Sequence, residues 1–349
     1  MKMKMKTACV TGGSGYIASA LIKMLLEKGY AVRTTVRNPD DTEKNSHMKE
    51  LQALGPLEVF RANLEEEGSF DDALAGCDYA FLVAAAAPPD DLVILHHQAP
   101  EVVMDACVRG ALNVMRSCAR SQSVKRVILT SSGSAVSSRP LQGQGRHVLE
   151  EDSWADVEYL TASDKSSPAD WAYPVSRVLM EKAACRFAQE HGIDLVTVCP
   201  VVTVGAAPAA CSRNDIPTTV PACLSLFSGD KSAFAALRSI ELGTGGGVPL
   251  VHIDDVCRAH IFVAEHDAAA GRYICCSINT TVIDIARFLQ DQYPHYTVRT
   301  ELLSGDLLVK PRVCLSCKLV REGFDFNYNL PEEIYDDMIH YGKALGILL

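Results

Sequence analysis

Short apolar runs alternate with longer amphipathic stretches along residues 1–200. The short runs are rich in Val, Ile and Thr and often end in Gly or Ser, as is typical of buried strands. The longer stretches repeat apolar residues at spacings of three and four, which predicts helices. We expect strands in TACVT, AVRTTVR, LEVFRANL, YAFLVAAA, VKRVILTSS and DLVTVCP, and helices in YIASALIKMLLEKG, 102–121 and 173–191.

After Pro200 the pattern becomes less regular. Two stretches, 206–223 and 242–247, are rich in Pro, Gly, Ala, Ser or Thr, so we expect loops there. A helical pattern returns at 253–266 and a strand pattern at 271–276. The chain therefore divides into a regular first part and a smaller, less regular second part.

Strands that alternate with helices predict parallel strands joined by crossover helices. The expected fold class is α/β, with a doubly wound parallel Rossmann sheet and a smaller, mixed C-terminal lobe. We place the sheet domain in residues 1–200, with a returning segment near 250–280, and the smaller lobe in 201–349.

Composition and charge narrow the class of partner. The chain has 349 residues, of which 48% are hydrophobic and 22% charged, as in ordinary globular proteins. Its formal net charge of -10 argues against a nucleic-acid partner, because binding to phosphates needs a basic face. No apolar run approaches the roughly 18 residues of a membrane span, and the N-terminal run is too short for a secretory signal. We expect a cytoplasmic protein.

The cysteine and histidine pattern does not predict a metal centre. The 13 cysteines are scattered, and in a reducing cytosol they are expected to be free and mostly buried. Cys314 and Cys317 form a lone CxxC, whereas a structural zinc site needs a second pair of ligands. The side chains of the adjacent His96 and His97 diverge on a helix or a strand.

A glycine-rich turn follows the first predicted strand. Gly12, Gly15 and Ala18 have the spacing G-x-x-G-x-x-A. A glycine at the turn has no Cβ to strain it, and the next lets the backbone approach a pyrophosphate. The following helix offers free N–H groups and a partial positive charge to that anion. A dinucleotide site is therefore predicted, and the alternative is a tight strand–helix turn without a ligand.

The end of the second strand bears on the choice of nicotinamide cofactor. NAD sites usually have an acidic residue there for the ribose hydroxyls. Here the strand ends at Arg37, and Lys44 follows. Positive charge suits the 2′-phosphate of NADP, so the sequence favours NADPH, although a solvated basic residue is the alternative. Residues 1–200 are then an NADP-binding domain and 201–349 a substrate-binding lobe.

Three residues form a candidate catalytic set. Ser132 lies at the carboxyl end of a buried strand, where doubly wound folds bind ligands. Tyr173 and Arg177 are four residues apart, so they share one face of the next long helix. A cation near a phenol favours the phenolate, which suits a tyrosine to exchange protons with a carbonyl. The alternative is a core tyrosine beside a surface arginine.

With these motifs the chain resembles an extended short-chain dehydrogenase/reductase of the plant dihydroflavonol reductase and anthocyanidin reductase group. The resemblance runs from KTACVTGGSGYIAS through KGYAVRTTVRNPDD and SVKRVILTSS to LVHIDDVCRAHIFVAE and GRYICC. It implies that Ser132 polarises the substrate oxygen, that Tyr173 donates a proton and that Arg177 is the cation. It implies cofactor contacts from Gly12, Ser14, Gly15, Tyr16, Ile17, Arg37, Lys44, Asn63, Leu64, Val83, Ala84, Ala85, Tyr173 and Pro200.

Two positions favour the anthocyanidin reductases within this group. Ala18 stands where dihydroflavonol reductases usually have glycine, and Ser137 stands where they usually have an asparagine that reads the flavonoid B-ring. The resemblance thus implies NADPH-dependent reduction of an anthocyanidin to a flavan-3-ol, with Ser137 in the substrate site. The alternatives are 4-ketone reduction of a dihydroflavonol and a weakly catalytic NADP-binding paralogue.

Three departures from the group pattern bear on activity. Arg177 replaces the usual lysine, Asn63 replaces an aspartate that usually meets the adenine, and residues 81–91 replace a more polar stretch. Arginine keeps the positive charge but directs its donors differently from an ammonium group. Because a misplacement of about 1 Å can slow a reaction about a hundredfold, we expect a functional but altered or slow reductase.

Overall fold

A seven-stranded parallel sheet forms the centre of the computed structural model, which describes residues 5–85, 100–140, 147–162, 168–209, 216–303, 313–315 and 318–348. The strand order is β3-β2-β1-β4-β5-β7-β10. The strands are β1 (Thr7–Thr11), β2 (Ala31–Val36), β3 (Leu57–Arg61), β4 (Tyr79–Leu82), β5 (Arg126–Thr130), β7 (Leu195–Pro200) and β10 (Gly271–Cys275).

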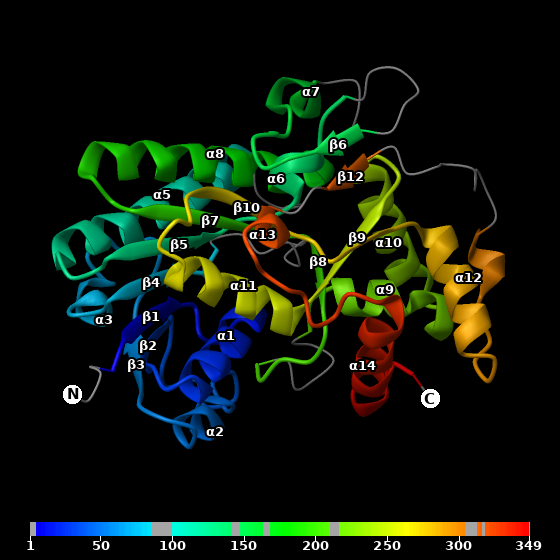
Figure 1. The fold of residues 1–349 in the computed structure, drawn as a ribbon, viewed down its shortest axis with the longest axis horizontal. Coiled ribbons are helices and arrows are strands. Elements are labelled where there is room, and N and C mark those ends of the chain that lie inside the picture. Colours follow the sequence, from blue (N-terminus) through cyan, green and yellow to red (C-terminus); the bar gives the residue numbers. More distant parts are fainter. Residues whose placement is uncertain are drawn as a thin grey trace.

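Helices cover both faces of this sheet (Figure 1). Alternate strand residues point to opposite faces, so Val10 and Ile128 join one core while Cys9, Val127 and Leu129 join the other. The first core includes α1 (Tyr16–Glu27), α2 (Met48–Gln52) and α11 (Ile253–Glu265), and the second includes α3 (Asp71–Leu74), α5 (Pro100–Ser121) and α8 (Pro168–His191). Burial on both faces explains the continuous apolar runs in the sequence.

The strand order reverses beside β1. The chain moves outward through β2 and β3 on one side, and through β4, β5, β7 and β10 on the other. After β1 the chain continues toward β2, and after β4 it continues toward β5, on opposite sides of this reversal. Such folds bind ligands at the point where the strand order reverses.

The second part of the chain forms a smaller lobe beside the sheet (Figure 1). A mixed sheet in the order β11-β9-β8 pairs β8 with β9 in parallel and β11 with β9 antiparallel. Its strands are β8 (Val202–Val204), β9 (Val248–His252) and β11 (Ile278–Thr280), and β6 (His147–Leu149) pairs with β12 (Val313–Leu315). The helices of the lobe are α9 (Thr219–Ser228), α10 (Lys231–Gly243), α12 (Val282–Gln292) and α14 (Pro331–Ala344).

Shorter elements complete the described chain. They are α6 (Ser134–Ser137), α7 (Val157–Thr161), α13 (Lys318–Arg321) and the 3-10 helix η1 (Thr300–Leu303). None of the helices within the described ranges is both long and apolar enough to cross a bilayer.

The predicted fold class is confirmed, and β10 returns the chain to the edge of the large sheet. The division of cofactor and substrate binding between 1–200 and 201–349 stays a prediction. One loop prediction is wrong in part, because α9 begins at Thr219 inside the stretch 206–223. Pro221 lies in the first turn of α9, where its missing N–H leaves no helical hydrogen bond unmade. Likewise, α10 extends to Gly243, inside the predicted loop 242–247.

Candidate active site

The predicted site residues follow six neighbouring strands. All these strands run parallel, so their carboxyl ends lie at one edge of the sheet. Across that edge the chain places Asn63 after β3, Arg37 after β2, Gly12 after β1, Val83 after β4, Ser132 after β5 and Pro200 at the end of β7. Residues that are far apart in the sequence thus form a continuous row along the crevice.

The glycine loop is built on close backbone contacts. The N–H groups of Gly12 and Gly13 donate to Oγ1 and O of Thr35 at 3.2 and 2.9 Å, and Gly15 N–H donates to Gly12 O at 2.8 Å. Gly12 has a φ of 76°, and a Cβ there would lie 2.9 Å from the Cβ of Ala84. Only glycine fits this position without strain or displacement, so the loop has the open cradle that a pyrophosphate needs.

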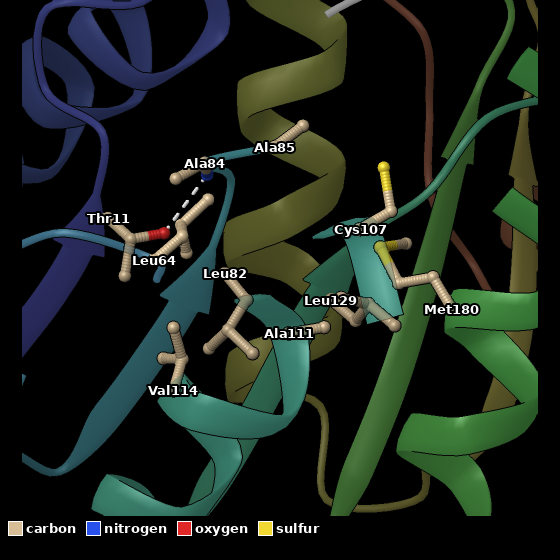
Figure 2. A pocket seen from close by; sticks show the side chains of 10 residues that line it. All are labelled: Thr11, Leu64, Leu82, Ala84, Ala85, Cys107, Ala111, Val114, Leu129 and Met180. Carbon is tan, nitrogen blue, oxygen red and sulfur yellow. Dashed lines mark hydrogen bonds between the residues drawn. The ribbon is translucent and has the colours of Figure 1, made fainter. Parts of the chain in front are cut away.

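Thr11 holds the end of β4 against the glycine loop. Its Oγ1 accepts hydrogen bonds from the N–H groups of Val83 and Ala84, both at 3.0 Å. Figure 2 shows the hydrogen bond between Thr11 and Ala84, which lies beside a cavity of about 10 Å³, roughly the space of one water. The cavity is lined by Thr11, Leu64, Leu82, Ala84, Ala85, Cys107, Ala111, Val114, Leu129 and Met180. Ala84 and Ala85 line this cavity, and their contact with a cofactor stays a prediction.

The start of α1 is anchored to the smaller lobe. The hydroxyl of Tyr16 donates to Gly205 O at 2.6 Å, and burial raises the pKa of Tyr16 well above its ordinary value. Tyr16 and Ile17 both pack against the larger core, while Ser14 lies in the loop before them. Because the Tyr16 hydroxyl is engaged here, we expect these residues to meet a cofactor mainly through the backbone at the helix N-terminus.

The two basic residues near the adenosine end are exposed. Arg37 follows β2 directly, and Lys44 lies in the turn before α2. Neither has an ion pair within the described part of the chain. Nearby, His47 is buried and donates from Nε2 to Gly13 O at 3.1 Å, and burial lowers the pKa of His47. The exposed cations suit either an NADP phosphate or plain solvation, so both interpretations stay open.

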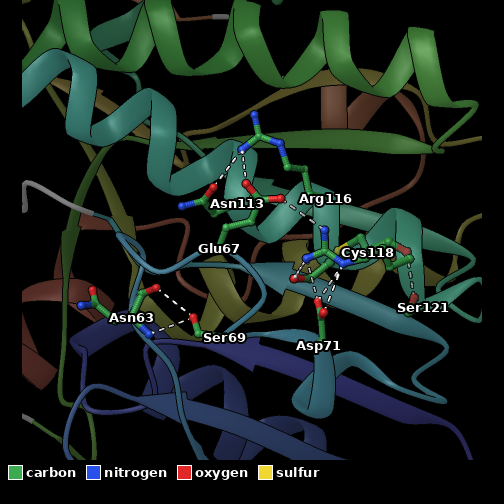
Figure 3. Close-up of polar contacts among 10 residues, drawn as sticks. Asn63, Glu67, Ser69, Asp71, Asn113, Arg116, Cys118 and Ser121 are labelled. Carbon is green, nitrogen blue, oxygen red and sulfur yellow. Dashed lines mark hydrogen bonds and ion pairs between the residues drawn. The ribbon is translucent and has the colours of Figure 1, made fainter.

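Asn63 is engaged with its own turn (Figure 3). Its Oδ1 accepts from Glu65 N–H at 3.2 Å, its Nδ2 donates to Glu66 at 3.4 Å, and its backbone pairs with Ser69. The carbonyl of Leu64 accepts from Asn113 Nδ2 at 2.8 Å. Both residues lie after β3 as expected, but the amide of Asn63 would have to share its acceptor to bind an adenine.

The strand end that carries Ser132 is held by several hydroxyl contacts. Thr130 Oγ1 donates to His260 Nε2 at 2.8 Å, because His260 Nδ1 donates to Val256 O at 2.7 Å. Burial lowers the pKa of His260 to about 4, so this imidazole is neutral near pH 7. Ser132 is half-buried, and its Oγ accepts from the backbone N–H and the hydroxyl of Ser134 at 3.2 and 3.0 Å.

Tyr173 and Arg177 form a stacked pair on α8. The guanidinium carbon of Arg177 lies 4.9 Å from the centre of the Tyr173 ring, within the range of a cation–π interaction. Arg177 is only 4% exposed, whereas Tyr173 is half-buried. The alternative of a surface arginine is therefore wrong. Arg177 Nη1 also lies 3.7 Å from the Met180 sulfur, so its fork is packed among buried groups.

The short helix α6 brings the serine and tyrosine segments to one place. Ala135 of α6 and Val178 of α8 share a small apolar core with Ala155. The N–H of Gly133 donates to Pro200 O at 2.8 Å, which ties the segment after Ser132 to the end of β7. The structure thus places Ser132 and Tyr173 on packed elements at the carboxyl edge.

Ser137 lies at the end of α6 and is 2% exposed. Its hydroxyl donates to Gly133 O at 3.2 Å and lines a second cavity of about 10 Å³ between α6 and the small sheets. Thr244 and Asn279 also line this cavity. The role of Ser137 in substrate binding stays a prediction.

Sequence reasoning missed the buried charges behind this pair. Glu181 on α8 is fully buried and contacts Ser131 and Arg272. Its one signal is the spacing of Tyr173, Arg177 and Glu181, which repeats every four residues along one helix face. Arg272 lies in the predicted strand GRYICC, but nothing local indicates its partner.

Some predictions fall outside the described residues. These are the positions of His96, His97 and Cys317, the side chain of Cys314, and residues 86–91 of the altered stretch. Among the residues that the structure does describe, no group of three or more His, Cys, Asp or Glu is placed to hold a metal ion.

Comparison with known proteins gives one consistent result. Residues 8–276 match the model of the NAD dependent epimerase/dehydratase family. The chain is 46% identical to an anthocyanidin reductase ((2S)-flavan-3-ol-forming) of Vitis vinifera, over 98% of this chain and 97% of that protein. It is 36% identical to a dihydroflavonol 4-reductase of Arabidopsis thaliana, over 100% and 85% of the two chains. The crystal structure of vestitone reductase from alfalfa (Medicago sativa L.) superposes with a TM-score of 0.78 at 34% identity, covering 98% and 99% of the chains.

The close contact at Gly12 generates a prediction. We expect Gly12→Ala to weaken binding of a nicotinamide dinucleotide about tenfold or more, because the new Cβ meets Ala84 and distorts the cradle. Isothermal titration calorimetry measures the affinity. Gly76→Ala is the matched control, since Gly76 also has a φ of 76° but has open space around its Cβ position.

The left-handed backbone alone should cost each variant about 1 kcal/mol in the free energy of unfolding, and Gly12→Ala should lose more because its Cβ also meets Ala84. Only Gly12→Ala should lose affinity. Equal affinity losses in the two variants would show that backbone strain, and not the cradle, controls binding.

Proposed function

The chain belongs to the NAD dependent epimerase/dehydratase family, within the group of anthocyanidin and dihydroflavonol reductases, and on that premise we propose that it reduces an anthocyanidin to a flavan-3-ol with NADPH. The observation that carries the reaction type is the stacked pair of the half-buried Tyr173 and the buried Arg177 on α8, the helix that packs against α6 after Ser132. The substrate class rests on the 46% identity to the Vitis vinifera anthocyanidin reductase.

The glycine loop fits the cofactor that the proposal requires. The cradle at Gly12 has no room for a side chain, and the N-terminus of α1 faces the same crevice. When bound there, NADPH supplies hydride. The exposed Arg37 and Lys44 would then hold the 2′-phosphate through charge-assisted hydrogen bonds.

The protein side chains supply positioning and the proton. The hydroxyl of Ser132 would hydrogen-bond the substrate oxygen and polarise it. Tyr173 would then donate its phenolic proton to the substrate, and the Arg177 guanidinium on its ring would stabilise the phenolate that remains. Because Arg177 is buried, water screens this interaction little.

Atom balance distinguishes the two candidate reactions. Converting an anthocyanidin cation to a flavan-3-ol requires two hydrides and one proton, whereas reduction of a dihydroflavonol ketone requires one of each. The first reaction therefore consumes two NADPH for each product and the second consumes one. The dihydroflavonol reaction is the second candidate, because the 36% identity to such a reductase covers the whole chain.

The test of the proposed function is NADPH consumption by the purified protein. Cyanidin and then dihydroquercetin are supplied, and products are identified and counted by chiral chromatography. We expect a flavan-3-ol from cyanidin with two NADPH oxidised for each product. A leucoanthocyanidin from dihydroquercetin at one NADPH each would favour the second candidate. NADPH binding without turnover of either compound would favour a cofactor-binding paralogue.

The proposed preference for NADPH over NADH leads to a separate prediction. Arg37→Ser should raise the KM for NADPH about tenfold or more and leave that for NADH nearly unchanged, because a hydrogen bond from a cation to phosphate contributes about 1.5–3 kcal/mol. Arg61→Ser is the control, since Arg61 ends the neighbouring strand β3 but is paired with Glu66 at 3.0 Å. If NADPH and NADH are affected alike by Arg37→Ser, a phosphate contact is ruled out.

The presence of arginine at position 177 leads to another prediction. Arg177→Lys should raise kcat about tenfold or more, because a compact ammonium reaches the phenol oxygen and the nicotinamide ribose more freely than a packed planar fork. Arg186→Lys, at an exposed position on the same helix, should change kcat little. An Arg177→Lys variant that is no faster than the parent would mean that arginine does not limit the reaction.

A further inference from the structure

One helical turn beyond Arg177, α8 carries a carboxylate that has no contact with solvent. Glu181 is 0% exposed. Tyr173, Arg177 and Glu181 are each four residues apart, so they form one row on the inner face of the helix. Nothing in the proposed reaction uses Glu181, and a buried carboxylate is costly unless its partners are well placed.

The partners of Glu181 come from two different strands. Oε1 accepts a hydrogen bond from the hydroxyl of Ser131, which follows β5. Oε2 accepts from Arg272 Nε of β10 at 2.8 Å. The carboxylate therefore joins three separate elements of the fold.

Arg272 is itself held from all sides. Its Nη1 donates to the carbonyls of Ser153 and Glu151 at 2.6 and 3.1 Å, and its guanidinium carbon lies 3.8 Å from the centre of the Trp154 ring. A guanidinium fixed in this way gives Glu181 a single preferred position. Glu181 in turn fixes Ser131, which immediately precedes Ser132.

We propose that Glu181 is a positioning residue, which sets the Ser132 strand end and the Arg177 turn of α8 in register with each other. The inference rests on the proposed function for its kinetic test. Glu181 acts through Ser131 and Arg177, and it does not touch the substrate.

The charges around Glu181 give it a second effect. The charged, titratable and hydroxyl groups that face it are Arg177 and Cys185 on α8, Arg272 on β10, Cys199 on β7 and Ser131 after β5. Burial raises the pKa of Glu181, while the charge of Arg272, the Ser131 hydrogen bond and the charge of Arg177 act in the opposite direction. An ionised Glu181 offsets one of two buried guanidinium charges, so removing it leaves more positive charge near Tyr173.

Two substitutions test the contacts of Glu181. Glu181→Gln should lower kcat about tenfold or more, with little change in the KM for NADPH. Ser131→Ala removes only the hydroxyl and keeps the Glu181–Arg272 pair, so it should lower kcat less, about threefold or more.

Glu241→Gln is the matched control. Glu241 is also buried, at 3% exposed, and pairs with Arg238 and with the N–H of Val282 in the smaller lobe. Glu241→Gln should lose stability but keep the parent kcat. If folded Glu181→Gln also has the parent kcat, the inference fails. If Glu181→Gln does not fold, an unchanged kcat in Ser131→Ala overturns the inference.

Hydrogen exchange makes the inference testable apart from the proposed function. Amides of residues 131–137 and 175–178 should exchange about tenfold faster in Ser131→Ala and Glu181→Gln, and at the parent rate in Glu241→Gln. If the parent protein turns over no flavonoid, only the proposed function is overturned. The hydrogen-exchange rates still test the positioning role of Glu181 in that case. Unchanged exchange in these segments would overturn that role even in an active enzyme.

Discussion

The close approach of the chain after β1 to the chain after β4 is the constraint on which the rest of the site depends. A Cβ at Gly12 would lie too close to the Cβ of Ala84 to be tolerated. The Thr11 hydroxyl oxygen holds the opposite loop by accepting hydrogen bonds from the backbone N–H groups of Val83 and Ala84. This contact lies where the strand order reverses, so it forms the floor of the crevice. The ends of β5 and β7 are then set at defined steps along the same edge, because parallel pairing fixes the spacing of neighbouring strands.

The second constraint is the burial of the arginine on α8. A guanidinium is more weakly hydrated than an ammonium, so its transfer into the protein next to an aromatic face costs less. Stacking on Tyr173 explains how this chain accommodates an arginine where its group usually has a lysine. The same stacking limits the directions in which the guanidinium N–H groups of Arg177 can donate hydrogen bonds. In the proposed function, Arg177 would therefore keep the positive charge beside the phenol but would offer fewer hydrogen bonds to a cofactor ribose.

The sequence predicted the fold better than it predicted the site. Each strand of the large sheet coincides with a short apolar run, because burial on both faces leaves a continuous hydrophobic signal. The start of α9 was missed because Pro221 and the polar residues before it indicate a loop, although proline is tolerated in a first turn. Glu181 is separated along the sequence from Ser131 by 50 positions and from Arg272 by 91 positions. Local periodicity carries no information about such pairings, so only the three-dimensional structure reveals them.

The short helix α6 joins the predicted catalytic residue Ser132 to the predicted substrate residue Ser137. Ser132 lies just before α6, Ser137 is the last residue of α6, and the Ser137 hydroxyl donates back to the carbonyl of Gly133, which precedes the helix. With its proton engaged, the Ser137 hydroxyl offers lone pairs to the cavity that it shares with Thr244 and Asn279. In the proposed function this favours a substrate that presents hydroxyl donors there. Because the turn is short and buried, a group that displaces Ser137 would also move Ser132, so substrate fit and proton transfer should vary together.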